Sequence, residues 1–139
     1  MTKPVSSIIN RAGRLLKVID AASATPALFS ENALIALNAM CLRWEQNGLA
    51  IGWAVVDQVD DDLPCQDYAE EAIAYNLAVA LGPEFPEPST WGEIKQRAGD
   101  SLAELRRDRM VAAPLKQVSD LPAPEANCGQ WNIYTDSPA

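Results

Sequence analysis

One stretch in the first half of the chain combines a helical apolar pattern with an immediate glycine stop. Its apolar residues recur at spacings of three and four, which places them on one face of an amphipathic α-helix. Asn47-Gly48 follows directly, and glycine readily takes the left-handed conformation in which many helices end. Residues 49–56 then include β-branched Val55 and Val56, which predict a short strand. The residues that define the helical face are Leu34, Leu37, Cys41 and Trp44.

The rest of the chain shows the same periodicity in three further segments. Residues 5–19, 67–81 and 90–110 each carry one apolar stripe, and Ser30 is a suitable N-cap for the helix described above. The low aromatic content, 6%, favours close helix packing over a sandwich or barrel. The sequence therefore predicts a mainly α fold: a small bundle of about four helices, an acidic loop after the second helix and an extended C-terminal arm. The core residues expected from the stripes are Leu37, Cys41, Trp44, Ile73, Leu77 and Leu102.

The chain divides into a helical domain, residues 1–111, and a proline-rich arm without helical periodicity, residues 112–139. At 139 residues it is long enough for one domain with a single modest core. The longest apolar run is far too short to cross a bilayer, and no secretory signal pattern opens the chain. Three cysteines that lie far apart suit a reducing compartment. We therefore expect a protein that is made in the cytoplasm and has no membrane segment.

Charge is distributed unevenly along the chain. The formal net charge is −8, yet no Lys or Arg occurs between Arg43 and Lys95, and that window holds eleven carboxylates. The remaining cations lie toward the two ends of the chain. Opposite charges in different segments suit a heterologous contact, in which the acidic surface of one copy meets the basic surface of the next and a ring can close. The alternative is that acids and bases solvate different faces of one monomer.

The sequence holds no pattern for catalysis or for a metal site. The acidic run of residues 57–62 lacks the ligand spacing, central glycine and closing glutamate of an EF-hand loop, so we expect a solvated loop there rather than calcium. The chain has no histidine, the usual general base near neutral pH, and adjacent Glu70 and Glu71 point to different faces of a helix. Nucleophile-elbow, Walker and Cys-x-x-Cys motifs are missing. We expect no catalytic residue, no bound metal and no cofactor.

Two further clusters are open to more than one interpretation. Arg106, Arg107 and Arg109 are basic enough to meet phosphate, but the acidic chain as a whole opposes non-specific DNA binding. They either stabilise the C-terminal end of their helix or contact another subunit. Trp131 and Tyr134 lie in the arm, where amphipathic aromatic residues are typical anchors for a partner surface. The alternative is that the arm folds back on its own helices.

Several short motifs follow one another in a particular order over residues 5–110. They are Leu37-x-x-Met40-x-x-x-Trp44, Gly48, Ile51-Gly52, the acidic loop, Glu71-Ala72-Ile73, Asn76-Leu77-Ala78 and Leu81-Gly82-Pro83-Glu84-Phe85. This order resembles the head-to-tail adaptors of tailed, especially short-tailed, bacteriophages, also called tail accessory or head-completion proteins. The chain departs from the family pattern in two places. Residues 15–19 contain no glycine where the family often has Leu-Gly, and the arm has no matching pattern.

The resemblance implies a structural virion protein and not an enzyme. Copies would assemble on the portal protein as a ring, typically twelve-fold, that extends the DNA channel, stabilises the packaged DNA and provides the attachment site for tail or nozzle proteins. DNA would pass through without specific binding, and the protein would lie at the head–tail junction after synthesis in the host bacterial cytoplasm. The expected subunit interface is Arg11, Arg14, Asp60, Asp61, Asp62, Arg106, Arg107 and Arg109. The expected portal-binding residues of the arm are Pro114, Leu121, Trp131, Ile133 and Tyr134.

Two functions of other classes remain open. One is a small acidic helical regulator that binds a basic protein through its acidic middle segment, which salt-dependent binding without ring formation would favour. The other is a tail-associated cell-wall hydrolase that acts through paired carboxylates, which loss of glycan cleavage on Glu→Gln substitution would favour.

Overall fold

The computed structural model describes residues 3–109, 131–132 and 137–138. Its fold is mainly α, as the sequence predicts, with four α-helices: α1 (Val5–Leu15), α2 (Ala27–Gln46), α3 (Glu70–Leu81) and α4 (Trp91–Arg109). Two 3-10 turns, η1 (Asp67–Ala69) and η2 (Gly82–Glu84), flank α3. Strand β1 (Trp131–Asn132) pairs antiparallel with β2 (Ser137–Pro138). Among the described residues, none of the helices contains an apolar stretch of the length that spans a bilayer.

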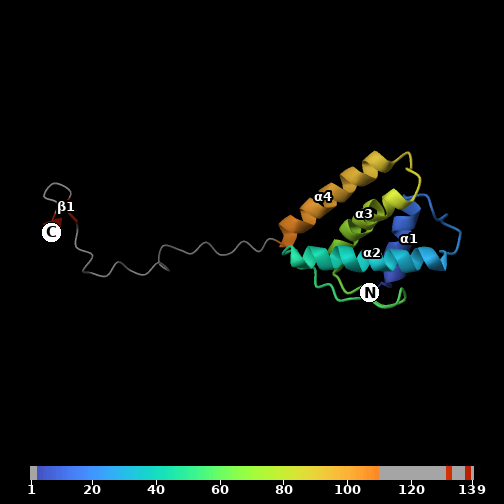
Figure 1. The fold of residues 1–139 in the computed structure, drawn as a ribbon, viewed down its shortest axis with the longest axis horizontal. Helices are drawn as coiled ribbons and strands as arrows, with labels where there is room; N and C mark the ends of the chain where they lie inside the picture. The colour runs from blue at the N-terminus through green and yellow to red at the C-terminus, as the bar shows by residue number, and fades with distance from the viewer. Residues whose placement is uncertain (1–2, 110–130, 133–136, 139) are drawn as a thin grey trace.

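The central helix is α3, and each of the other three helices packs against it (Figure 1). Its side chains are small or apolar over most of its circumference, so burying them requires neighbouring helices on several sides. Alanine at many of the contacts lets the neighbouring helices come close to its backbone. The buried residues of α3 are Ala72, Ile73, Ala74, Leu77, Ala78 and Leu81.

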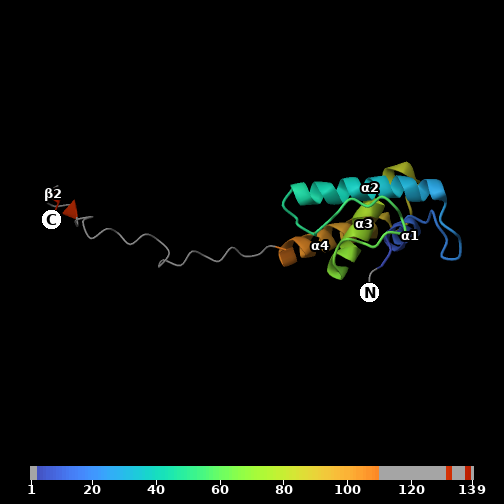
Figure 2. The ribbon, with the colours of Figure 1, turned by 90° about the horizontal axis from the view of Figure 1, so that it is seen from below.

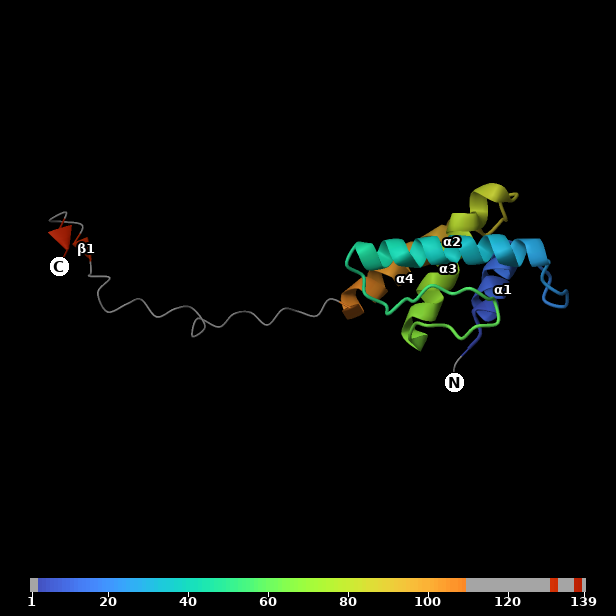
Figure 3. The same ribbon diagram turned by 60° about the horizontal axis from the view of Figure 1, so that its bottom comes forward.

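The remaining helices surround α3 on different sides. Helix α2 crosses α3 and forms one side of the body, while α4 packs along α3 on another side (Figures 1 and 2). Asn76 links α3 to α4, because its side-chain amide donates to the carbonyl of Ala72 in its own helix (2.8 Å) and to the carbonyl of Ala98 in α4 (3.1 Å). The connection from α2 to η1 runs back along α2 toward the start of α1 (Figure 3).

The first helix is shorter than predicted and ends at Leu15 instead of near residue 19. Lys17 takes the left-handed conformation, with φ of 59°. The Val18 N–H then donates to the carbonyl of Gly13 (3.0 Å) and the Lys17 N–H to that of Arg14 (3.1 Å), the two bonds of a Schellman ending. The reversal turns buried Ile19 back onto the last turn of α1. Helical periodicity continues through this stretch, so the sequence pattern did not reveal the turn.

The second helix begins earlier than predicted. Its first residue is Ala27, with Pro26 as N-cap, so the prediction that Ser30 caps the helix is wrong. Ser30 lies in the first turn, where its hydroxyl donates to the carbonyl of Pro26 (3.3 Å). The additional turn buries Phe29 against Phe85, with the ring centroids 5.7 Å apart. Burial of an aromatic side chain outweighs the smaller gain from a serine cap.

Replacing Lys17 with glycine is expected to raise the free energy of unfolding by roughly 0.5–1 kcal/mol, because glycine takes the left-handed conformation without the strain of a Cβ. Lys17 makes no ion pair with any described residue, so little is lost with its side chain. Urea denaturation measures the difference. Lys17→Ala is the matched control, since it removes the side chain but keeps the strain. Equal stability of the two variants would contradict the prediction.

Candidate functional site

The acidic loop, residues 57–62, caps the start of α1. The Val5 N–H donates to the carbonyl of Asp61 (2.9 Å), and the Ser6 N–H donates to the carbonyl of Val59 (2.7 Å). The first N–H groups of a helix have no acceptor within the helix, and here two carbonyl groups of the acidic loop accept two of these N–H groups. The loop is therefore fixed to α1 by its main chain, and its carboxylates remain available to solvent.

The main chain of Asp61 and Asp62 adjoins the N-terminal end of α1, and Asp60 precedes them directly, so the three aspartates are near the end of the helix where its dipole favours negative charge. All three residues are exposed. Asp61 also accepts the N–H of Gln58 on its Oδ2 (3.0 Å), so it has a role within the loop itself. Among the described residues, no group of three or more Cys, Asp or Glu side chains is arranged to hold a metal ion. The loop is an exposed acidic surface at one end of α1.

Two side chains of α2 hold the segment that leads into this loop. Asn38 donates to the carbonyl of Val56 (2.8 Å), and its Oδ1 accepts the Val56 N–H (3.1 Å) and the Trp53 indole N–H (3.2 Å). One Glu45 oxygen, Oε1, accepts the backbone N–H groups of Ile51 (3.0 Å) and Trp53 (2.8 Å). These bonds replace those that a neighbouring strand would make. The prediction of a short strand over residues 49–56 is therefore wrong, since side chains of a helix take up these main-chain groups.

The hydrogen bonds from Asn38 and Glu45 to residues 51–56 are called the clamp below, and two glycines make it possible. Gly48, with φ of 88°, ends α2 as the sequence predicts. Gly52, with φ of 78°, lies between the two N–H groups that converge on Glu45. Such a left-handed residue lets neighbouring N–H groups point at one anionic oxygen. The sequence signal for the clamp was present but missed: Asn38 and Glu45 stand seven residues apart, on one side of α2, ahead of an apolar segment without a partner strand.

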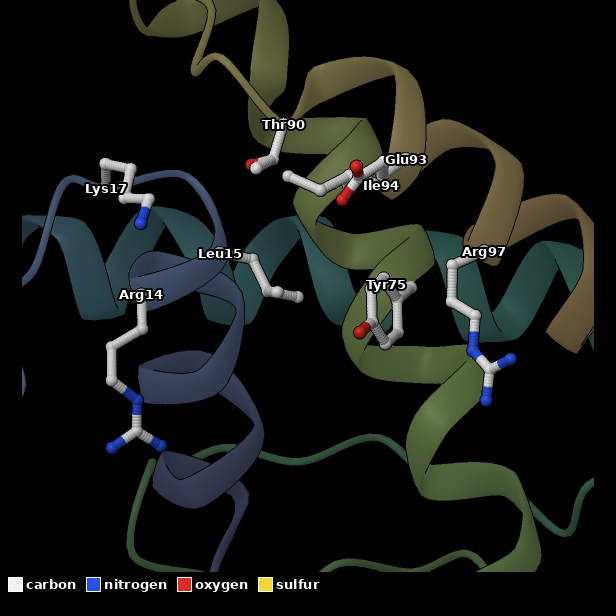
Figure 4. A pocket seen from close by; sticks show the side chains of 8 residues that line it. All are labelled: Arg14, Leu15, Lys17, Tyr75, Thr90, Glu93, Ile94 and Arg97. Carbon is white, nitrogen blue, oxygen red and sulfur yellow. The ribbon is translucent and has the colours of Figure 1, made fainter.

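A basic pocket lies at the other end of α1, bounded by α1, α3 and α4, with a volume of about 410 Å³ (Figure 4). Arg14, Lys17 and Arg97 stand around its rim in the figure, and the Tyr75 side chain lies between α1 and α3. Arg11, one of the predicted interface residues, lies over Tyr75, with its guanidinium carbon 5.5 Å from the centre of the ring. Arg14 and Lys17 at the end of α1 thus meet Arg97 of α4 at one pocket, which the single acid Glu93 also lines.

Two cations of the end segments pair with acids of the middle segment inside the monomer. Lys3 Nζ lies 2.8 Å from Glu70 Oε2, and Arg97 Nη2 lies 2.7 Å from Glu71 Oε1. The hydrogen bond to the carboxylate raises the pKa of Lys3, and a hydrogen bond to Glu71 likewise raises the pKa of Arg97. Both cations are about half exposed, so neither pair stabilises the fold by much. Part of the charge separation in the sequence is therefore cancelled in the folded chain.

Other predicted interface charges are left without such partners. Arg14, Asp60 and Asp62 make no ion pair with any described residue. Arg106, Arg107 and Arg109 are exposed on the last turn of α4 and do not pair with the acidic loop within the described chain.

The end of α4 lies beside the end of α2. The guanidinium carbon of Arg109 lies 5.4 Å from the centre of the Tyr68 ring, and Arg106 and Arg109 border a smaller pocket with Asn47 and Gly48. The structure thus places the predicted interface residues in three separate groups: Arg11 and Arg14 on α1, the three aspartates at its start, and the arginines of α4.

Most of the predicted core is buried and the predicted arm is largely outside the described residues. Leu37, Cys41, Trp44, Ile73 and Leu77 are buried, while Leu102 is half-buried at the edge of the core. Pro114, Leu121, Ile133 and Tyr134 lie outside the described residues, and for Trp131 only the backbone pairing in β1 is described.

The two cysteines that the structure describes are free thiols, Cys41 buried and Cys65 half-buried. Burial raises the pKa of both thiols, that of Cys65 to about 11. Neither thiol is therefore ionised to a useful extent near neutral pH.

A scan against protein-family models gives no match to this chain, and a search of curated proteins gives none either. The observations that bear on function are therefore the charged surfaces at the two ends of α1 and the motifs of the sequence.

Removing the side chain of Asn38 is expected to lower the free energy of unfolding by roughly 2–3 kcal/mol, because the main-chain groups of Val56 and the indole N–H of Trp53 lose their partners. Thermal or urea denaturation of Asn38→Ala measures the loss. Asn32→Ala is the matched control: Asn32 is an exposed amide on the same helix, and its removal should change stability by less than about 0.5 kcal/mol. Similar losses in the two variants would show that the clamp contributes little.

Proposed function

We propose that the protein is a head-to-tail adaptor of a tailed bacteriophage, a structural virion protein that assembles as a ring beneath the portal. The observation that carries the proposal is the placement of opposite charges at the two ends of α1. The acidic loop caps the first turn, and Arg14 and Lys17 border the basic pocket at the last turn. With 11 residues α1 is about 16 Å long, roughly twice the Debye length at physiological salt. The two surfaces are therefore largely screened from each other within one monomer.

In this assembly the acidic loop of one copy contacts the basic pocket of the next. The contact is heterologous, so it repeats around a ring when the rotation between neighbours closes, typically with twelve copies in this family. Contacts between exposed charges give orientation more than affinity, so the free protein is monomeric or weakly associated. Portal, which offers one docking position per subunit, raises the effective concentration of neighbouring copies and drives ring closure.

An acidic ring also suits a DNA channel. The net charge of −8 repels phosphate, so DNA passes along the channel without specific binding. Tail or nozzle proteins attach below the ring, at the head–tail junction of the virion. The role requires no catalytic residue, metal or cofactor.

The motifs behind the family resemblance coincide with local structural roles. Trp44 is buried, and Gly48 and Gly52 take positive φ at the end of α2 and within the clamped segment. The departure at the end of the first helix has a structural counterpart too. Lys17 takes the left-handed conformation that a glycine would adopt after Leu16. These residues support the proposal because the family motifs fall where they shape the helices and the segment that position the acidic loop.

A second candidate is a monomeric acidic module that binds a basic protein. It is favoured by the internal pairs Lys3–Glu70 and Arg97–Glu71, which show that acids and bases of different segments can satisfy one another in a single copy. Such a module would bind one partner in a salt-dependent manner and form no ring.

Reversing the charge at one end of α1 is expected to prevent ring formation on portal. Asp60→Lys with Asp62→Lys, or Arg14→Glu with Lys17→Glu, places like charges in every contact between copies. Combining all four substitutions restores opposite charges and should restore the ring. Asp61 is left unchanged because it bonds within its own loop. Native mass spectrometry of each variant mixed with portal counts the bound copies.

The matched control for the Asp60 and Asp62 double variant is Asp100→Lys with Glu104→Lys, which makes the same change in net charge at exposed positions of α4. Ring formation by the Asp60 and Asp62 double variant at the wild-type level would contradict the proposed contact. If the control variant also fails, the loss reflects net charge and not the acidic loop.

Deleting residues 113–139 is expected to leave a folded protein that no longer binds portal. Leu105 is the last buried core residue in the described part of the chain, so the deletion removes no described core side chain. The arm sequence holds Trp131 and Tyr134 beside the aliphatic Ile133, and aromatic anchors such as Trp and Tyr often dominate binding energy at interfaces. Circular dichroism tests folding, and co-sedimentation with portal tests binding. Normal portal binding by the truncated protein would show that the arm is not the portal contact.

A further inference from the structure

The outer face of α2 carries a row of exposed apolar side chains. Leu28, Ile35 and Leu42 follow one another at intervals of seven residues and are 70%, 69% and 38% exposed. The helix buries its other side against the core, through Phe29, Ala33, Leu37, Cys41 and Trp44. In Figure 2, α2 forms the upper edge of the helical body. Large apolar side chains grouped on one exposed face mark an interaction surface more often than isolated ones do.

The residues between these apolar positions complete a heptad repeat. Taking Leu28, Ile35 and Leu42 as d positions makes Asn32, Ala39 and Gln46 the a positions, and these three are exposed as well. We call this row of six residues the α2 seam. It contains no charged residue, whereas Glu31 and Arg43 lie beside it. Over the 20 residues of α2, about 30 Å, the seam presents three apolar layers at the period of a two-helix contact.

A second copy of α2 fits the seam when the two helices run parallel and in register. Each apolar d residue then meets the same residue of the other copy. The two Asn32 side chains also meet, and an amide pair at a single a position is a known determinant of register in parallel helix pairs. Flanking positions bring Glu31 near Ala36 and Arg43 near Asn38, so no like charges oppose each other.

The antiparallel arrangement is less favourable on two counts. It places the amides of Asn32 and Gln46 against Leu42 and Leu28, where they have no hydrogen-bond partner. It also brings Glu31 toward Glu45 of the other copy, which places like charges side by side.

We propose that the α2 seam is the contact of a parallel homodimer of the free protein. The dimer uses neither the acidic loop nor the basic pocket, so it does not rest on the adaptor function. One helix face per copy buries much less than the roughly 800 Å² per partner of a standard stable interface. The dimer is therefore weak, with a dissociation constant of roughly tens to hundreds of micromolar.

Sedimentation equilibrium over a concentration series tests the contact. The wild-type chain should shift from monomer to dimer, and Ile35→Asp should weaken dimerisation at least about 100-fold by placing a charge in the centre of the seam. Val55→Asp is the matched control, because Val55 is an apolar residue with 60% exposure that lies off the seam. Leu28→Asp provides a second seam variant if Ile35→Asp reduces the helix content. A monomeric wild type, a dimer that survives both seam substitutions, or equal loss in the control overturns the proposal.

Disulfide trapping tests the orientation. In a chain whose own cysteines are replaced by serine or alanine, Leu28→Cys or Leu42→Cys alone should give a covalent dimer on mild oxidation, since equivalent residues adjoin in a parallel pair. Preferential cross-linking between an Asn32→Cys chain and a Leu42→Cys chain would instead show an antiparallel pair and overturn the proposed geometry.

Discussion

Burial of α3 on several sides is the interaction on which the rest of the fold depends. This helix is rich in alanine and carries charge only in its first turn, at Glu70 and Glu71. Exposure of its apolar side chains to water is unfavourable, and their small size lets α1, α2 and α4 approach its backbone closely. Dispersion contacts and apolar burial then accumulate over three helix–helix contacts instead of one. Asn76 adds a polar tie from the same helix to α4 without leaving its amide donors unused.

The charged surfaces follow from this packing. Because α1 and α4 both lie on α3, Arg97 of α4 comes to the same pocket as Arg14 and Lys17 at the end of α1, although it is distant from them in the sequence. Glu70 and Glu71, in the first turn of α3, pair with Lys3 and Arg97. The acidic loop is placed by a different mechanism: Asn38 and Glu45 hold the segment before it, and its own carbonyls cap α1. The loop is thus acidic on the outside and fixed in position through its main chain.

Several elements were predictable from local patterns and several were not. The end of α2 at Asn47-Gly48 was predictable, because a glycine that directly follows an amphipathic stripe is typical of a helix end. The end of α1 was not, since Lys17 takes a conformation that its residue type disfavours and that packing of Ile19 compensates. Helix α2 begins earlier than predicted because Phe29 packs against Phe85, which is more than fifty residues away in the chain. Residues 49–56 have the composition of a strand, but their hydrogen bonds go to helix side chains.

Residue types and their order along the chain were enough to set the mainly α fold class, the stop after α2, most of the buried apolar residues and the excess of acid in the middle of the chain. These properties depend on spacings of three and four and on local composition, which can be read without knowing any long-range contact. Three outcomes required the folded chain: which charges cancel within one copy, which three cations share a pocket, and which face of α2 stays exposed. They depend on how helices distant in sequence cross one another, and crossing geometry is settled by the packing of side chains from all four helices at once.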